Sequence, residues 1–463
     1  MGAKWSWGWI AEALQAKAQG PLGPDSPVSR VWTDTRTAQA GDLFVALSGK
    51  RYDAHAFLKD AHAQGVRHFI VSDPKAVPAE FAKDSGVIVA ADTLMAYGDL
   101  AKAHRLKFNI PCVVITGSCG KTTVKEMTAH LLGARYTVLK NIGTENNLVG
   151  VPKTLFGLDA SHQAVVLEIG TSLPGEIARL AEIASPQAAV ITQIGAAHLE
   201  GLGTLEGIRE EKTSLIPFVQ RGGVIILNGE DPMLAAVTSG VHRVVRVGTS
   251  KSNADRIIDN PWSHEKGNSF SMDGVLYETS LLGRHNLINA ALAVTAAAQL
   301  AVDPESCRKA LAAFRGAPGR LEPKTIEGIH FLDDTYNANP TSFAAALDAL
   351  RDLKTHERGK GVVCGDMLEL GPRAEEWHRQ IGEKLAGLQL DFVVAAGEHC
   401  RALVDEAVQK GFNPKKIFAV KDSAAAGKLC RELAKPGDLV LVKGSRGMKM
   451  EKVFECFITS SIR

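Results

Sequence analysis

The sequence contains little cysteine and no cysteine motif. Its seven cysteines are scattered over 463 residues, and no two of them form a C-x-x-C pair. This distribution argues against a disulfide framework and against a zinc site, and it is typical of proteins kept in a reducing compartment. We therefore expect a cytoplasmic protein.

Long hydrophobic runs are missing as well. A membrane-spanning helix needs roughly 18 uninterrupted apolar residues, whereas the most apolar helical stretch, residues 287–301, is rich in alanine and is interrupted by Asn289. The first residues, MGAKWSWGWIAEALQ, lack the apolar core and the small-residue cleavage site of a signal peptide. We expect no membrane span and no secretion signal.

Neither sign of charge dominates. The formal net charge is +2, so we expect no basic surface for a nucleic acid. The composition, 45% hydrophobic and 22% charged, is that of a globular protein. Because 463 residues exceed one ordinary core, we expect several domains in a monomeric protein.

Strands and helices alternate along the whole chain, which predicts an α/β protein of three domains. Residues 1–107 predict a small α/β domain. Residues 108–317 hold near-continuous apolar strands between helices, as in a parallel sheet covered on both faces. A Gly/Pro break at 316–319 marks a linker. Residues 318–463 predict a second doubly wound, Rossmann-like domain. A long helical stretch is expected at 286–314, and strands are expected at 42–47, 67–72, 86–91, 112–116, 164–169, 188–194, 223–227, 329–333, 361–364, 392–396, 416–420 and 439–442.

A glycine-rich segment, T-G-S-C-G-K-T-T at residues 116–123, stands between an apolar strand and an expected helix at 122–132. This context is typical of a phosphate-binding loop, because the glycines let successive backbone N–H groups point into one concavity at a helix N-terminus. Lys121 adds a full positive charge near the β- and γ-phosphates, and the Thr122 hydroxyl can ligate Mg²⁺.

The loop departs from the general pattern G-x-x-x-x-G-K-[ST] in one respect. Ile115 stands where that pattern has its first glycine. The Lys-Thr pair nevertheless favours a nucleotide site over a plain turn. We predict nucleoside triphosphate binding by Gly117, Ser118, Cys119, Gly120, Lys121, Thr122 and Thr123.

Three polar residues that follow the phosphate loop in the chain are candidates for metal binding or catalysis. Glu168 ends an apolar strand, where its carboxylate could hold Mg²⁺ with Thr122, although a solvated edge residue would look the same. His198 follows the next strand in the same way and is either a ligand or a satisfied polar residue. Lys212, within E-E-K-T, has the sequence context of a surface lysine.

Together these segments resemble the Mur ligase superfamily, and the resemblance covers essentially the whole chain. It is carried by the phosphate loop, by the strand ending at Glu168, by A-A-H-L-E-G around His198 and by the E-K pair at Lys212. The octet D-D-T-Y-N-A-N-P at 333–340 is typical of the member that adds a D-alanyl-D-alanine dipeptide. Further matching segments are G-R-H-N at 283–286, P-G-R-L at 318–321 and K-G-S-R at 443–446.

The resemblance implies ATP and two Mg²⁺ ions as cofactors. Thr122 and Glu168 would hold one ion, and His198 the other together with a carbamylated Lys212, since a carbamate supplies the anionic oxygen that a hard cation prefers. Asn286 would contact adenine, and Asp334 the ribose. Arg320 would reach the γ-phosphate from the hinge. The implied catalytic residues are Lys121, Glu168, His198, Lys212 and Arg320.

The resemblance also implies the substrates. A UDP-linked muramoyl tripeptide would be activated as an acyl phosphate and joined to D-alanyl-D-alanine, in the synthesis of peptidoglycan precursors. The N-terminal domain would bind the UDP end, the central domain ATP, and the C-terminal domain the dipeptide. The residues expected to contact these substrates are Thr35, Arg36, Ser48, Gly49, Asn141, Asn146, Asn337 and Asn339.

Alternative functions stay open at this point. A sister ligase or a folylpolyglutamate synthase would add a single amino acid instead of a dipeptide. The diaminopimelate-adding enzymes carry a D-N-P-R motif in the C-terminal domain, whereas the D-N-P run here, at 259–261, lies in the central block and is followed by Trp262. A nucleotide-dependent switch protein would lack turnover, and a simple kinase would not release phosphate in response to an amine.

Overall fold

The computed structural model describes residues 4–49, 52–143, 145–353 and 359–458. The chain divides into two compact units: Met1–Cys112, Thr137–Ile169 and Ala178–Pro186 form the first, and Val113–Tyr136, Gly170–Ile177 and Gln187–Arg463 form the second. The predicted α/β class is confirmed, while the domain boundaries at 107 and 317 stay predictions. No helix among the described residues combines the length and apolar character that crossing a membrane requires.

The first unit contains a five-stranded sheet of order β2-β7-β6-β5-β4. Its last four members are parallel, and β2 joins the edge antiparallel. Phe44, Phe69 and Phe81 form part of the core beneath it. The strands predicted at 42–47, 67–72 and 86–91 are confirmed with shorter ends. The strands are β2 (Ala18–Gln19), β4 (Arg30–Trp32), β5 (Asp42–Val45), β6 (His68–Val71) and β7 (Gly86–Val89).

The first unit also holds two strands that pair in parallel, β9 (Val138–Lys140) and β10 (Ala164–Glu168). β10 is buried along its whole length, as its apolar sequence predicts. The two-stranded ribbon of β1 (Trp5–Ser6) and β3 (Pro27–Val28) is antiparallel. The helices are α1 (Trp7–Ala13), α2 (Leu58–Ala63), α3 (Thr93–Leu106) and α5 (Gly150–Phe156), and most of α6 (Glu176–Ala184) also belongs here.

The second unit contains five parallel strands in the order β14-β13-β12-β11-β8. β8, β11 and β12 are buried throughout, which confirms the predicted parallel sheet and places its loops at one carboxyl edge. The strands are β8 (Cys112–Thr116), β11 (Ala188–Ile191), β12 (Val224–Asn228), β13 (Arg243–Gly248) and β14 (Arg256–Ile257), and the helices are α4 (Lys121–Leu132), α7 (Leu199–Leu202), α8 (Leu205–Thr213), α9 (Pro232–Ala235), α10 (His285–Gln299) and α11 (Pro304–Ala313).

The single helical stretch expected at 286–314 is wrong, because the structure has two helices there. α10 ends at Gln299, and Ala301 has a left-handed backbone with φ 56°. Asp303 then caps α11 by accepting the Ser306 N–H at 2.9 Å, and Pro304 occupies its first turn. A left-handed residue followed by a capped proline ends one helix and begins another.

A three-stranded antiparallel sheet was not expected from the sequence. It consists of β15 (Asp259–His264), β16 (Gly267–Met272) and β17 (Val275–Thr279), and the D-N-P run lies on its edge strand. Polar and apolar side chains alternate in β16, with Phe270 and Met272 buried. The polar content of β15 hides this strand from a search for apolar runs.

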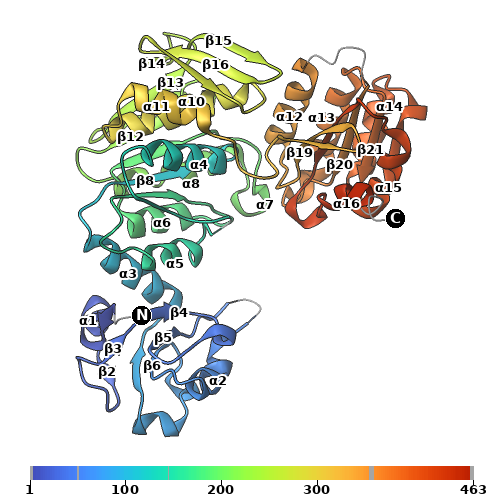
Figure 1. Ribbon diagram of the computed structural model, residues 1–463. Helices are drawn as coiled ribbons and strands as arrows, with labels where there is room; N and C mark the ends of the chain where they lie inside the picture. Colours follow the sequence, from blue (N-terminus) through green and yellow to red (C-terminus); the bar gives the residue numbers. More distant parts are fainter. Residues whose placement is uncertain (1–3, 50–51, 144, 354–358, 459–463) are drawn as a thin grey trace. The chain divides into compact units, whose positions relative to one another are not determined.

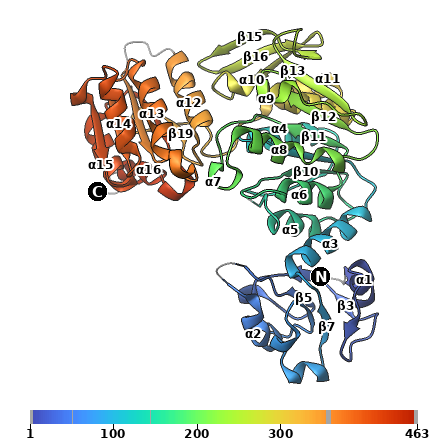
Figure 2. The same ribbon diagram turned by 180° about the vertical axis from the view of Figure 1, so that it is seen from behind.

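The C-terminal part of the second unit has a six-stranded sheet of order β18-β19-β23-β20-β21-β22, with only β18 antiparallel. Alternate strand residues enter two separate cores, one under α12, α13 and α14 and the other under α15 and α16, so helices cover both faces (Figures 1 and 2). This confirms the predicted doubly wound sheet. The elements are β18 (Glu322–Ile326), β19 (Ile329–Asp334), β20 (Lys360–Gly365), β21 (Phe392–Ala396), β22 (Ile417–Val420), β23 (Leu439–Lys443), α12 (Pro340–Asp352), α13 (Ala374–Ala386), α14 (Cys400–Gln409), α15 (Ser423–Leu433) and α16 (Lys452–Ile458).

Candidate active site

The phosphate loop runs from the end of β8 to the start of α4. Gly117 and Gly120 both have positive φ, 144° and 81°, and Gly120 is the residue that precedes the first helical turn. Both conformations favour glycine, which lacks a Cβ. The loop therefore brings backbone N–H groups and the positive end of the α4 dipole to one place, as anion binding requires.

The loop is also crowded where its glycines lie. A Cβ on Gly120 would be 2.6 Å from the Asn289 side-chain oxygen, and one on Gly117 would be 2.0 Å from the Thr192 hydroxyl oxygen. Gly222 offers a contrast, since it has φ 82° but nothing within 4 Å of an added Cβ. At Gly117, both the backbone conformation and the close contact with Thr192 therefore require a glycine.

Replacing Gly117 with alanine is expected to weaken binding of a non-hydrolysable ATP analogue about 100-fold (~3 kcal/mol). The added methyl group would displace either Thr192 or the loop, and with it the N–H groups that face the phosphates. Isothermal titration calorimetry measures the loss, and Gly222→Ala serves as the control because it adds backbone strain without a clash. Equal analogue affinity in the two variants would contradict this account of the loop.

The loop is held by hydrogen bonds to the segment that follows β11. Ser118 donates its backbone N–H to the Gln193 carbonyl at 2.7 Å and its hydroxyl to the Gly195 carbonyl at 2.8 Å. The Gly195 N–H returns a hydrogen bond to the Ser118 hydroxyl at 2.9 Å. The segment after β11, which leads to His198, is therefore held directly against the phosphate loop.

Lys121 and Thr122 begin α4. The Lys121 ammonium donates to the Gly117 carbonyl at 2.9 Å, so it is folded over the loop. The Thr122 hydroxyl accepts a hydrogen bond at 2.8 Å from Arg320, which lies 198 residues further along the chain. The structure thus brings together three residues that the sequence predicted for the γ-phosphate region.

Arg320 is itself well positioned. Its guanidinium lies 4.2 Å from the centroid of the Tyr336 ring, an arrangement that holds the planar group in place. Its Nε is buried and has no hydrogen-bond partner among the described residues. An unsatisfied buried N–H is costly, and beside a phosphate loop it fits an anionic ligand.

The N-terminus of α12 also touches the loop. Asn339 caps this helix by accepting the Ser342 N–H at 2.8 Å, and its amide NH₂ donates to the Ser118 carbonyl at 3.3 Å. The Cys119 thiol donates to the Asn339 side-chain oxygen at 3.2 Å. Burial raises the pKa of Cys119, so the thiol stays protonated and is a poor nucleophile. The predicted role of Asn339 in substrate binding stays a prediction.

His198 and Lys212 differ in their surroundings. Lys212 lies on α8 with 1% exposure, so the surface position suggested by its sequence context is wrong. His198 is partly exposed and donates from Nδ1 to the Glu369 carboxylate at 2.7 Å, and this hydrogen bond holds the pKa of Glu369 below its usual range. Sequence reasoning missed Glu369, since nothing in its neighbourhood points to a residue 171 positions away.

Asp334 and Asn286 both have partners within the protein, Asp334 in an ion pair and Asn286 in hydrogen bonds. The Lys443 ammonium, 1% exposed, forms a 2.6 Å ion pair with Asp334 and donates to the Asn337 carbonyl at 3.0 Å. The Asn286 amide donates to the Leu282 carbonyl at 2.7 Å and accepts from Asn289 at 2.8 Å. The contacts predicted for these residues with ribose, adenine and substrate stay predictions.

In the first unit, Glu168 is the centre of a small network. Its backbone N–H donates to the Asn141 side-chain oxygen at 3.0 Å, and the Asn141 NH₂ donates to its carbonyl at 2.9 Å. The Asn146 NH₂ donates to the Glu168 carboxylate at 2.8 Å. The structure thus gives Asn141 and Asn146, expected at the substrate, a role in orienting the predicted metal ligand.

The residues predicted for the UDP end lie at one edge of the first unit's sheet. Thr35 and Arg36 follow β4, and Ser48 and Gly49 follow β5; because β4 and β5 are parallel, both loops leave the same carboxyl edge. Arg36 is exposed and forms a 2.7 Å ion pair with Asp34. An exposed arginine at such an edge is suited to a phosphate group.

The site combines a phosphate loop and its lysine, a threonine hydroxyl suited to Mg²⁺, and an arginine from the segment before β18. Together they define a nucleotide-dependent α/β enzyme of the phosphate-loop class. Residues 115–297 match the model of the Mur ligase middle domain, and residues 319–446 match that of the Mur ligase glutamate ligase domain. The chain belongs to the Mur ligase family.

Relatives extend this match over the whole chain. The UDP-N-acetylmuramoyl-tripeptide--D-alanyl-D-alanine ligase of Bacillus subtilis is 34% identical, with 98% of both chains covered. A crystal structure of MurF from Acinetobacter baumannii superposes with a TM-score of 0.89 at 31% identity, over 99% of this chain and 100% of that one. The MurF ligase of Thermotoga maritima, solved with ADP, gives a TM-score of 0.81 at 28% identity, over 93% of this chain and 97% of that one.

Proposed function

We propose that this protein is an ATP-dependent ligase that joins D-alanyl-D-alanine to UDP-N-acetylmuramoyl-tripeptide in the cytoplasmic synthesis of peptidoglycan precursors. The contact between Arg320 and Thr122 carries the proposal, because it brings a cation from the hinge to the residue that follows the phosphate-loop lysine. The full-length similarity to the Bacillus subtilis ligase supports the choice of substrates. This similarity favours a dipeptide as the acceptor substrate over a single amino acid.

The reaction would proceed in two steps. A carboxylate oxygen of the tripeptide attacks the γ-phosphorus of ATP, the bond to the bridging oxygen breaks, and ADP leaves. The amine nitrogen of D-alanyl-D-alanine then attacks the carbonyl carbon of the acyl phosphate, inorganic phosphate leaves, and the nitrogen loses a proton. Lys121, Arg320 and the loop N–H groups would stabilise the charge that develops on the transferred phosphoryl group.

The proposed metal ligands suit a hard cation. The Thr122 hydroxyl and the Glu168 carboxylate are oxygen donors, and a carbamate on Lys212 would be another. His198 keeps Nε2 without a hydrogen-bond partner among the described residues, since the Glu369 contact uses Nδ1. Bound Mg²⁺ would neutralise phosphate charge and polarise the phosphoryl oxygens. The resemblance to Mur ligases implies two such ions, with His198 and Lys212 as ligands of one and Thr122 and Glu168 as ligands of the other.

In this proposal, the segment before Arg320 would serve as the hinge about which the C-terminal domain closes over the nucleotide. Gly316 and Gly319 both have positive φ, 83° and 67°, and Arg320 follows directly. Movement about these glycines would bring Arg320 and Asn339 to the loop or withdraw them, and closure would exclude water from the acyl phosphate. Compaction on adding an ATP analogue and both substrates, measured by small-angle scattering, tests this.

Turnover with different acceptors tests the proposed function. ADP release is followed with UDP-N-acetylmuramoyl-tripeptide and either D-alanyl-D-alanine or single amino acids, and the product mass is determined. Amide product with the dipeptide alone is the expected result. Product with a single amino acid would move the protein to a sister ligase, ADP without an acceptor would indicate a kinase, and no ADP under any condition would favour a switch protein.

A further inference from the structure

His198 and Glu369 meet from two different sheets of the second unit. His198 follows β11 of the central sheet, and Glu369 lies in the loop after β20 of the C-terminal sheet. Their side chains are joined by a 2.7 Å hydrogen bond between His198 Nδ1 and Glu369 Oε2. Because a carboxylate can only accept, Nδ1 carries the hydrogen, and a neutral imidazole in this tautomer presents its lone pair at Nε2.

Both residues are held in a backbone conformation that side chains disfavour. His198 has φ 56° and Glu369 has φ 62°. Non-glycine residues adopt such angles rarely and at a cost in free energy, and they persist where the surrounding structure fixes them. Two such residues in direct contact indicate that the contact is built into the fold.

The loop that carries Glu369 is anchored at three consecutive residues. Asp366 accepts the N–H groups of Cys400 at 2.8 Å and Glu398 at 3.0 Å. The Met367 N–H donates to His378 Nε2 at 3.0 Å, and the Leu368 N–H donates to Ser445 at 2.9 Å. Glu369 is therefore the first residue of this loop whose side chain extends to the central sheet, where it contacts His198.

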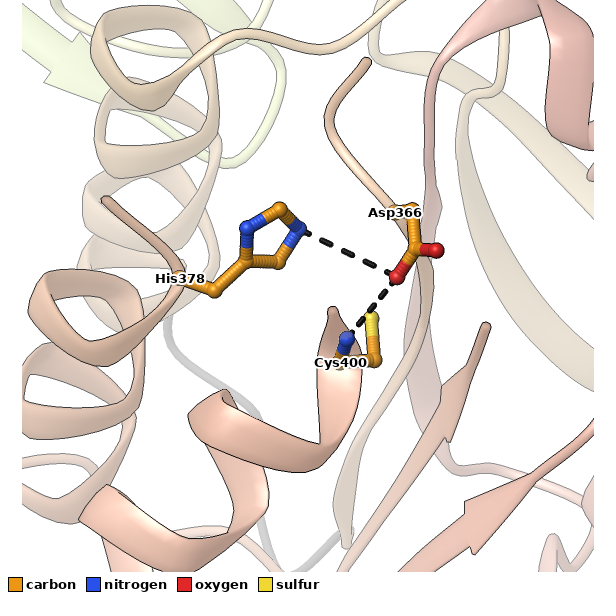
Figure 3. A group of neighbouring side chains, drawn as sticks. All are labelled: Asp366, His378 and Cys400. Carbon is orange, nitrogen blue, oxygen red and sulfur yellow. Dashed lines mark hydrogen bonds and ion pairs between the residues drawn. The ribbon is translucent and has the colours of Figure 1, made fainter. Parts of the chain in front are cut away.

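Figure 3 shows part of this anchor, the buried side chains of Asp366, His378 and Cys400. Their ligand atoms lie within 4.8 Å of one another, but each has a structural role already. His378 Nε2 accepts from Met367 and Nδ1 donates to the Ala374 carbonyl at 2.7 Å, so the ring is neutral, in keeping with a pKa that burial lowers. The 3.9 Å contact with Asp366 is then no ion pair, and the cluster serves as an anchor and not as a metal site.

The two sheets also meet close to this pair. A Cβ on Gly195 would be 2.4 Å from the Thr341 hydroxyl at the start of α12, so only a glycine allows this approach. A Cβ on Gly371 would be 3.6 Å from Glu200, in ordinary contact. The contact between His198 and Glu369 therefore belongs to a packed interface and depends on the docking of the C-terminal domain.

We propose that Glu369 is a positioning residue, whose carboxylate fixes the tautomer and ring orientation of His198 so that Nε2 faces the bound divalent cation. The proposal rests on the proposed function, since it takes His198 as a cation ligand. A carboxylate behind a ligating histidine typically contributes 10- to 100-fold to metal affinity. Because Glu369 comes from the C-terminal domain, cation binding at His198 would be strongest in the closed enzyme.

Binding of Mn²⁺ to the full chain in the presence of a non-hydrolysable ATP analogue tests this, by electron paramagnetic resonance. Glu369→Ala is expected to weaken the His198-dependent Mn²⁺ about 10-fold or more, and Glu369→Gln less, because its amide oxygen can still accept from Nδ1. Glu432→Ala, which removes an exposed carboxylate of the same domain, should leave Mn²⁺ affinity unchanged.

A double-mutant cycle separates positioning from a general loss of structure. In a His198→Ala background, Glu369→Ala should cause no further loss of Mn²⁺ affinity. Unchanged affinity in Glu369→Ala alone, or an equal loss with and without His198, would overturn the proposal. Failure of the proposed function would appear separately, as a wild-type enzyme that forms no amide product.

Discussion

Alanine in place of Lys121 is expected to lower the rate of amide formation about 1,000-fold (~4 kcal/mol). The ammonium is the first side chain of α4 and lies over the loop, 2.9 Å from the Gly117 carbonyl. In such loops the lysine places a full positive charge near the β- and γ-phosphates, and no group of the backbone carries such a charge. Coupled ADP release with saturating substrates measures the effect.

The matched control is Lys309→Ala, which removes an exposed lysine from α11. It should leave the rate unchanged, because a surface lysine pair contributes little. Lys121→Arg should recover only part of the rate, since a planar guanidinium does not fit the space of an ammonium. A Lys121→Ala enzyme within tenfold of wild type would remove this lysine from the mechanism and weaken the phosphate-loop interpretation.

Loss of Lys212 is expected to have the second largest effect, about 100-fold or more in turnover (~3 kcal/mol). The side chain is 1% exposed, so it lies in the interior of the protein and not on its surface. If its neutral amine adds CO₂, the nitrogen forms a bond to the carbon and loses a proton, and the oxygens of the resulting carbamate become anionic donors. A short carboxylic acid such as propionate should then partly restore Lys212→Ala by supplying the missing carboxylate.

Lys121→Ala is the control for this rescue, because a carboxylate cannot replace a cation there. Carbon-13 NMR of the wild-type enzyme in labelled bicarbonate should show one carbamate signal that Lys212→Ala lacks. Absence of both the signal and the rescue, in a variant that melts like wild type, would leave Lys212 as a structural lysine. If propionate also restored Lys121→Ala, the rescue would not depend on the position of Lys212 and would give no support for a carbamate there.

The sequence predicted most of the parallel strands, because buried strands are short apolar runs that can be recognised locally. β8 and β21 were predicted with their observed bounds. Several strands were not predicted, among them β4, β9, β13, β14 and β18. Two further features escaped, the polar strands of the β15–β17 sheet and the break between α10 and α11. Both depend on single residues and turns, such as the left-handed Ala301, and not on an extended pattern.

The phosphate loop was determined by the sequence itself. Its glycines, Lys121 and Thr122 lie close together in the chain, between a strand and a helix, so the motif can be recognised locally. Hydrogen bonds from Ser118 to Gln193 and Gly195 then hold the loop in place. Tertiary structure alone decided the rest of the site: that Arg320 reaches Thr122, that Glu369 reaches His198, and that Lys212 is buried. These residues are far apart in the chain or appear ordinary in their local context, so only the packing of the sheets determines which of them meet.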